Sequence, residues 1–136
     1  MAYLMIIDDD EDFSAAVAKV LREAGHEVRA ETEIAPAVRS MLERRPDLVV
    51  LDVMFPEDSS AGFQLARDMR RKLEGLDQVP ILMLTAVNTR APFGFSAKDI
   101  DEDWLPVTDF LEKPVDMDVL ADRVSALLAS SAGRRP

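Results

Sequence analysis

The chain has 136 residues, of which 16 are Lys or Arg and 26 are Asp or Glu, so its formal net charge is −10; 48% of its residues are apolar. This length and composition favour one domain with its own core over a disordered chain or several domains. The absence of Cys and the presence of a single His, His26, exclude a disulfide framework and a structural zinc site made of these ligands.

The excess of acids also restricts the partners. Basic residues are scattered and outnumbered, whereas neutralising DNA phosphates requires clustered Lys and Arg, so we expect no direct nucleic-acid binding. No uncharged apolar run approaches the roughly 18 residues of a membrane span. The first residues do not combine a cationic segment with a long apolar one, as a secretory signal does. We therefore expect a cytoplasmic protein without membrane insertion.

Short apolar runs alternate with helical stripes along the whole chain. Three continuous runs are typical of strands buried on both faces of a parallel sheet, and two weaker runs complete the series: 3–7, 27–30, 48–51, 81–84 and 110–111. The stripes between them predict amphipathic helices, and their apolar positions are Phe13, Val17, Val20, Leu21 and Ala24; Val38, Met41 and Leu42; Phe63, Leu65, Ala66 and Met69; and Met117, Leu120, Val124, Leu127 and Leu128. Asp116 is the expected N-cap of the last helix, and Gly25, Gly75 and Gly133 lie where helices should end.

This β-α alternation predicts a doubly wound α/β fold. Right-handed crossovers place helices on both faces of a five-stranded parallel sheet, in the flavodoxin-like order 2-1-3-4-5. The predicted domain covers residues 1–129, and residues 130–136 read as a C-terminal tail. Residues 88–108 contain no clean helical stripe, and their shape is left open.

Polar residues that could bind a ligand or take part in a reaction follow the predicted strands. Asp8, Asp9 and Asp10 come directly after the first strand, Asp52 ends the third, Thr85 follows the fourth and Lys113 follows the fifth. Ligands of such sheets bind at the carboxyl ends of the strands. An acidic run of this kind is also typical of a solvated turn that starts a helix. Because strands one and three are neighbours in the predicted order, Asp8, Asp9 and Asp52 should converge, and repulsion between them favours a bound cation. Oxygen ligands that leave room for water suit Mg²⁺.

The segments MIIDDD, PDLVVLDVMFP, VPILMLTA and DFLEKPVD resemble, in order and place, those of bacterial response-regulator receiver domains, the chemotaxis-regulator-like two-component family. The resemblance implies that Asp52 accepts a phosphoryl group as a carboxylate nucleophile. It implies that Asp8, Asp9, Asp52 and the main-chain carbonyl of Met54 bind Mg²⁺.

The resemblance also assigns roles to the far side of the site. It implies that Thr85 hydrogen-bonds the phosphoryl group, that Lys113 pairs with its charge, and that Phe110 is the aromatic switch residue. It makes Pro114 the family's often cis proline. Plain packing in the core is the alternative for Phe110. The segments 56–62 and 85–113 are longer than usual for the family.

The leading hypothesis is a stand-alone phosphorylation switch, not an enzyme in the ordinary sense, although it would assist its own phosphorylation and dephosphorylation. The expected partners are a sensor histidine kinase or phosphotransfer protein and an unidentified downstream protein, with a homodimer as a further alternative. A phosphohydrolase with an aspartyl-phosphate intermediate would need an acid/base carboxylate at position 54, where Met54 stands. A degenerate receiver that acts only through protein contacts is the third alternative.

Overall fold

A parallel five-stranded sheet forms the centre of the molecule. A computed structural model describes residues 2–52, 61–73, 75–86, 109–113 and 115–132. The strands are β1 (Tyr3–Ile7), β2 (Glu27–Glu31), β3 (Leu48–Asp52), β4 (Ile81–Ala86) and β5 (Asp109–Lys113). Their spatial order is β2-β1-β3-β4-β5, and every neighbouring pair is parallel. The predicted order is confirmed, and each predicted apolar run lies inside an observed strand.

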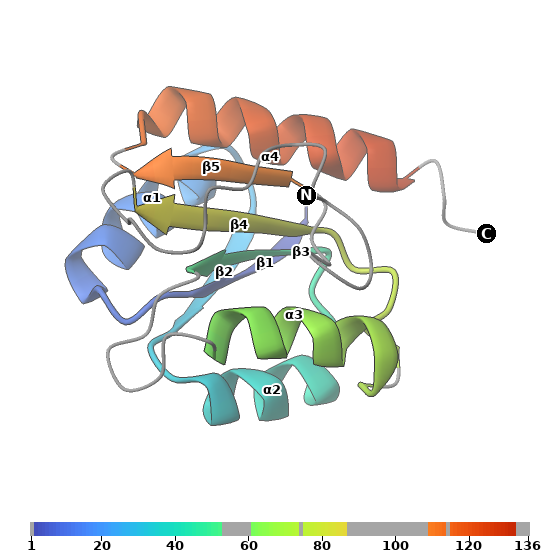
Figure 1. Cartoon of the computed structure of the whole chain (residues 1–136). Helices are drawn as coiled ribbons and strands as arrows, with labels where there is room; N and C mark the ends of the chain where they lie inside the picture. The colour runs from blue at the N-terminus through green and yellow to red at the C-terminus, as the bar shows by residue number, and fades with distance from the viewer. Residues whose placement is uncertain (1, 53–60, 74, 87–108, 114, 133–136) are drawn as a thin grey trace.

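Helices cover both faces of this sheet. The described helices are α1 (Glu11–Glu23), α2 (Ile34–Glu43), α3 (Ala61–Arg71) and α4 (Met117–Ala132). Figure 1 shows α2 and α3 together on one face of the sheet and α4 along the other. This arrangement confirms the doubly wound α/β prediction. Residues 88–108, in which no clean helical stripe was predicted, lie outside the described residues. None of the described helices is both long and apolar enough to cross a membrane.

The alternation of side chains along the strands divides the core into two apolar layers. In β1, Met5 and Ile7 pack with α2 and α3, whereas Leu4 and Ile6 pack with α1 and α4. The same alternation continues through β3 and β4, whose described apolar side chains are almost completely buried. Strands of this kind are buried on both faces, which explains why their sequences are continuously apolar.

The helix ends follow the predicted capping residues. The Asp116 carboxylate accepts a hydrogen bond from the Asp118 main-chain N–H at 2.8 Å, so the predicted N-cap of α4 is confirmed. Gly25 follows α1 with a φ of +98° and Gly75 follows α3 with a φ of +86°, values that favour glycine. Helix α4 continues to Ala132, so the first residues of the predicted tail are helical. Gly133 and the rest of the tail lie outside the described residues, and the domain boundary stays a prediction.

Candidate functional site

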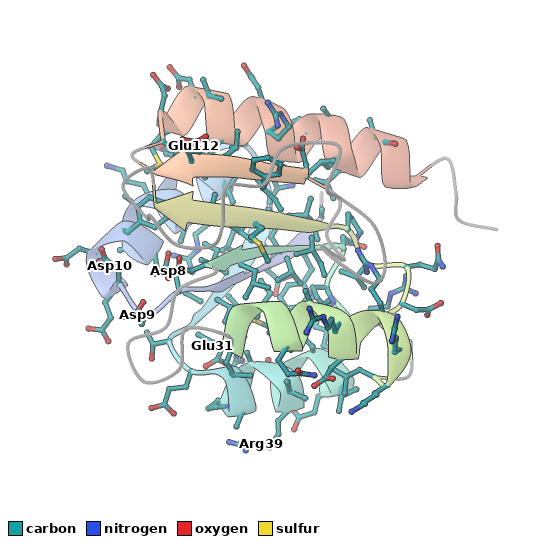
Figure 2. All side chains as sticks on the ribbon, in the orientation of Figure 1. Asp8, Asp9, Asp10, Glu31, Arg39 and Glu112 are labelled. Atoms are coloured by element: carbon teal, nitrogen blue, oxygen red, sulfur yellow. The ribbon has the colours of Figure 1, made fainter. Side chains whose placement is uncertain are left out.

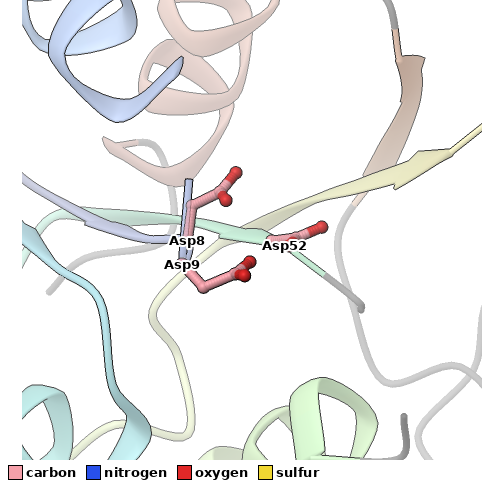
Figure 3. Close-up of side chains that lie close together, drawn as sticks. All are labelled: Asp8, Asp9 and Asp52. Atoms are coloured by element: carbon pink, nitrogen blue, oxygen red, sulfur yellow. The ribbon is translucent and has the colours of Figure 1, made fainter. Parts of the chain in front are cut away.

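Two neighbouring strands bring three carboxylates together at the carboxyl edge of the sheet. The register pairs Ile7 of β1 with Leu51 of β3, so Asp8 and Asp52 follow at the same level. Asp8, Asp9 and Asp52 each offer a carboxylate oxygen, and these oxygens all lie within 4.8 Å of one another. Figure 3 shows the three side chains gathered above the ends of these strands. The predicted convergence of Asp8, Asp9 and Asp52 is therefore confirmed.

Burial makes this acidic cluster energetically unusual. Asp8 is 1% exposed and Asp52 is 5% exposed, whereas Asp9 is open to solvent. Carboxylates rarely lose their water without a compensating partner, because a charge is poorly solvated in a protein interior. Three negative charges whose carboxylate oxygens lie within 4.8 Å of one another also repel one another. A divalent cation would offset both costs, and the exposed Asp9 leaves the cluster accessible from solvent.

The loop that carries Asp8 is held from several sides. The Asp8 main-chain N–H donates to the carbonyl of Glu31 in β2 at 3.1 Å, and its carboxylate accepts a hydrogen bond from the Asp10 N–H at 2.9 Å. The buried hydroxyl of Ser14 in α1 lies 3.4 Å from the Asp8 carbonyl oxygen and donates to it. The sequence interpretation missed Ser14 and Glu31. Ser14 carried a signal, because it is a hydroxyl at a position on the apolar stripe of Val17.

Asp10 has a structural role beside the cluster. Its carboxylate accepts a hydrogen bond from the Phe13 main-chain N–H at 3.0 Å and so caps the start of α1. The run of acids after β1 is thus both a helix start, as the plain interpretation of the sequence held, and part of a converging site. One segment serves both purposes because its successive side chains point in different directions.

The structure describes the positions of some of the remaining predicted site residues and not of others. Asp52 is level with Leu84 of β4. Thr85 is the second-last residue of β4 and Lys113 the last residue of β5, so both lie inside their strands and not after them, and all three stand near the carboxyl edge of the sheet. Phe110 is half-buried and packs against the apolar layer under α2 and α3. This position fits plain core packing, and its switch role stays a prediction. The positions of Met54 and Pro114 lie outside the described residues.

The surroundings of the cluster are also acidic. Figure 2 shows Asp10, Glu31 and Glu112 near the same edge as Asp8 and Asp9. Such a surface repels anionic ligands unless a cation or a basic partner accompanies them. Among the described residues, the donor set consists of carboxylate oxygens, which suit a hard cation such as Mg²⁺ and not a soft metal.

Comparison with known proteins decides the family. Residues 4–125 match the family described as response regulator receiver domain. The chain belongs to this family. As a receiver domain, it is 34% identical over 128 residues to the transcriptional regulatory protein AfsQ1 of Streptomyces coelicolor, an alignment that covers 94% of this chain and 52% of AfsQ1.

Solved structures of receiver domains share the architecture. A crystal structure from Chloroflexus aurantiacus, described as a response regulator, superposes with a TM-score of 0.76 at 32% identity, covering 94% of this chain and 98% of the other. NtrX from Brucella abortus superposes with a TM-score of 0.80 at 25% identity, covering 98% of this chain and 29% of NtrX. The chain spans about half the length of the curated relatives that it matches. It is the receiver part of those regulators that this chain resembles.

Proposed function

We propose that this receiver domain accepts a phosphoryl group on Asp52 from a histidine kinase or phosphotransfer protein and so switches a protein contact. The single observation that carries the proposal is the convergence of Asp8, Asp9 and Asp52 within 4.8 Å at the carboxyl edge of the sheet. Of these three, Asp52 ends the central strand β3, where it pairs with Leu84 of β4 and directly follows Leu51, which pairs with β1, so the sheet fixes its position. A nucleophile needs this fixed placement to meet phosphorus in line.

The chain's own carboxylates would divide the chemistry between them. Asp8 and Asp9, with Asp52 and the Met54 carbonyl, are the proposed ligands of Mg²⁺, which when bound offsets their charge and that of the phosphoryl oxygens. A carboxylate oxygen of Asp52 then forms a P–O bond as the P–N bond to the donor histidine breaks. The hydrogen bonds from Asp10 and Ser14 keep Asp8 in place while the anion enters.

The far side of the site would bind the transferred group. We assign to Thr85 a hydrogen bond to a phosphoryl oxygen and to Lys113 an ion pair with it, because Thr85 stands near the carboxyl end of β4, beside β3, and Lys113 at the carboxyl end of β5, beside β4. Phe110 is the proposed relay from Thr85 to the outer surface. These assignments rest on strand position and on the family to which the chain belongs.

The phosphohydrolase alternative has less support. It requires an acid/base carboxylate two residues after Asp52, and the sequence has Met54 there. The receiver function has no such requirement, since the transfer ends at the acyl phosphate. The names of the curated relatives describe transcriptional regulators, and these are about twice as long as this chain. Action as a stand-alone switch and the identity of the output partner therefore stay proposals.

Phosphorylation with a small donor tests the assignment. The protein is incubated with acetyl phosphate and Mg²⁺, and mass spectrometry after chemical trapping should place the modification on Asp52. Chelation of the metal and the Asp52→Asn substitution should each abolish labelling. The matched control is Asp12→Asn, an exposed acid on α1 outside the cluster, which should be labelled like the parent. Equal labelling of Asp52→Asn, or labelling indifferent to chelator, would refute the proposal.

A further inference from the structure

The outer edge of β2 is a surface that the phosphorylation site does not use. β2 is the first strand in the sheet order and pairs only with β1 among the described strands. A polar groove of about 460 Å³ runs beside it, with walls that include Arg22 of α1 and Ser40 of α2. In the strand order, β1 and β3 separate β2 from β4 and β5. Additional chain could therefore reach its backbone.

The backbone of β2 leaves hydrogen-bonding groups on this outer side. The Glu27 N–H donates to Ala2 and the Glu31 carbonyl accepts from Asp8, so residues 27, 29 and 31 bond to β1. The N–H and C=O groups of residues 28 and 30 therefore point outward. Arg22 donates to the Val28 carbonyl at 2.9 Å. For the Val28 N–H and for both main-chain groups of Ala30, the described residues provide no partner.

The side chains of β2 alternate in charge along the face toward α2 and α3. Glu27, Arg29 and Glu31 are level with Tyr3, Met5 and Ile7 of β1, and Met5 and Ile7 face α2 and α3. Arg29 already pairs with Glu31 at 2.8 Å, and both side chains lie at the surface of the groove. Charges on an edge strand usually prevent pairing with another chain. In β2 acidic and basic side chains alternate, so a second strand can pair favourably only in registers that bring opposite charges together.

We infer that the edge of β2 pairs with β2 of a second copy of this chain, antiparallel and centred on Ala30. In this register the two Ala30 residues exchange both of their main-chain hydrogen bonds, and the Val28 N–H is opposite the Thr32 carbonyl of the second copy. Arg29 of each copy is then directly opposite Glu31 of the other, at the closer, non-hydrogen-bonded positions. The sheet becomes continuous across the two copies.

Other registers are less favourable. A pair centred on Arg29 puts like charges opposite one another, which destabilises an antiparallel pair. A pair centred on Val28 depends on the Val28 carbonyl, which Arg22 already occupies. The Ala30-centred pair uses the open main-chain groups of Ala30 and the Val28 N–H, and it places opposite charges at both of its central cross-strand pairs, Arg29 with Glu31. Because it involves one short strand per copy, the contact is small, and we expect a weak and rapidly exchanging dimer.

Sedimentation velocity over a concentration series, at low salt, measures this association. The parent should show a sedimentation coefficient that rises toward that of a dimer. Ala30→Pro removes both reciprocal N–H donors without removing a bond of the monomer, so it should stay monomeric with an unchanged circular dichroism spectrum. The matched control Ala30→Thr keeps the N–H and suits a strand, so it should associate like the parent.

A mixing experiment tests the register itself. Arg29→Glu places acids at both positions of the cross-strand pair, and Glu31→Arg places bases at both, so each variant alone should remain monomeric. In an equal mixture the charges at positions 29 and 31 are opposite between the two variants, and association should return. A parent that is monomeric at every concentration, an Ala30→Pro variant that associates like the parent, or a mixture that stays monomeric would each overturn the inference. If the edge of β2 instead pairs with a strand of another protein, the parent alone should be monomeric at every concentration.

Discussion

Removing one negative charge from the buried cluster is expected to stabilise the receiver domain when no metal is present. The perturbation is Asp52→Asn, which keeps the size of the side chain and one carbonyl oxygen but removes the charge. Asp52 is 5% exposed and has two carboxylates, those of Asp8 and Asp9, within 4.8 Å. The substitution therefore removes two repulsions at once.

The magnitude follows from the distance between the oxygens. At 4.8 Å, each pair of unit charges repels by about 0.9 kcal/mol with the dielectric constant of water and by about 3.5 kcal/mol at an effective constant of about 20. Two pairs are removed, and solvent access at Asp9 and relaxation of the loop reduce the upper value, so we expect a gain of about 2–3 kcal/mol in the free energy of unfolding. For a domain of this size, about 1 kcal/mol raises the melting temperature by about 3–5 °C.

Thermal unfolding in chelator and in excess Mg²⁺ is the assay. In chelator, Asp52→Asn and Asp9→Ala should melt above the parent, whereas the exposed control Asp122→Asn on α4 should differ little. In Mg²⁺ the parent should gain stability because the cation binds only the folded cluster, and both cluster variants should lose that gain. Cluster variants that melt below the parent in chelator would show that the repulsion is already compensated within the protein, and the electrostatic reasoning would fail.

Three further predictions concern the fold and the lifetime of the acyl phosphate. Asp116→Ala should destabilise the domain by about 1 kcal/mol because α4 loses its cap, while Asp116→Asn should cost little, as chemical denaturation can measure. The hydrogen bonds from Arg44 lower the pKa of Glu27, so the pair stabilises the fold at pH values above the ordinary carboxyl pKa and loses this contribution as the pH falls. The melting temperature of Glu27→Gln should therefore depend less on acid pH than that of the parent, and an unchanged dependence would contradict the pairing. Met54 and Val87 occupy the positions two residues past Asp52 and Thr85. Both are apolar and cannot orient the water that would hydrolyse the acyl phosphate. The double substitution Met54→Asn and Val87→Glu should shorten the acyl-phosphate lifetime in a phosphate-release assay, and an equal or longer lifetime would place the control of water elsewhere.

The local pattern of the sequence was sufficient for the architecture. Continuous apolar runs such as residues 3–7 occur because both faces of a central strand are covered, and this pattern survives in the linear sequence. The right-handed crossover rule placed helices on both faces, and the strand order was taken as the flavodoxin-like one. Capping by Asp116 and the turn at Gly25 were also predictable, because a cap depends on residues within one turn of the helix.

The sequence also indicated which residues belong to the site. Asp8 and Asp52 are 44 residues apart, yet each follows or ends a run of strand residues, and parallel strands present their carboxyl ends at one edge. That rule was enough to predict their convergence. It gave no information on burial, and the near-complete removal of Asp8 and Asp52 from solvent is seen only in the folded structure.

Contacts between distant segments were decided by the tertiary structure alone. The hydrogen bond from the Asp8 N–H to the Glu31 carbonyl depends on the pairing of β1 with β2, and that from Ser14 to the Asp8 carbonyl depends on how α1 packs against the sheet. The open groups of Ala30 likewise follow from the position of β2 at the limit of the sheet, not from the residues of β2. Hydrophobic patterning indicates which residues are buried, but it does not specify which polar atoms form hydrogen bonds with one another. The distances between those atoms are set by the packing of whole helices and strands.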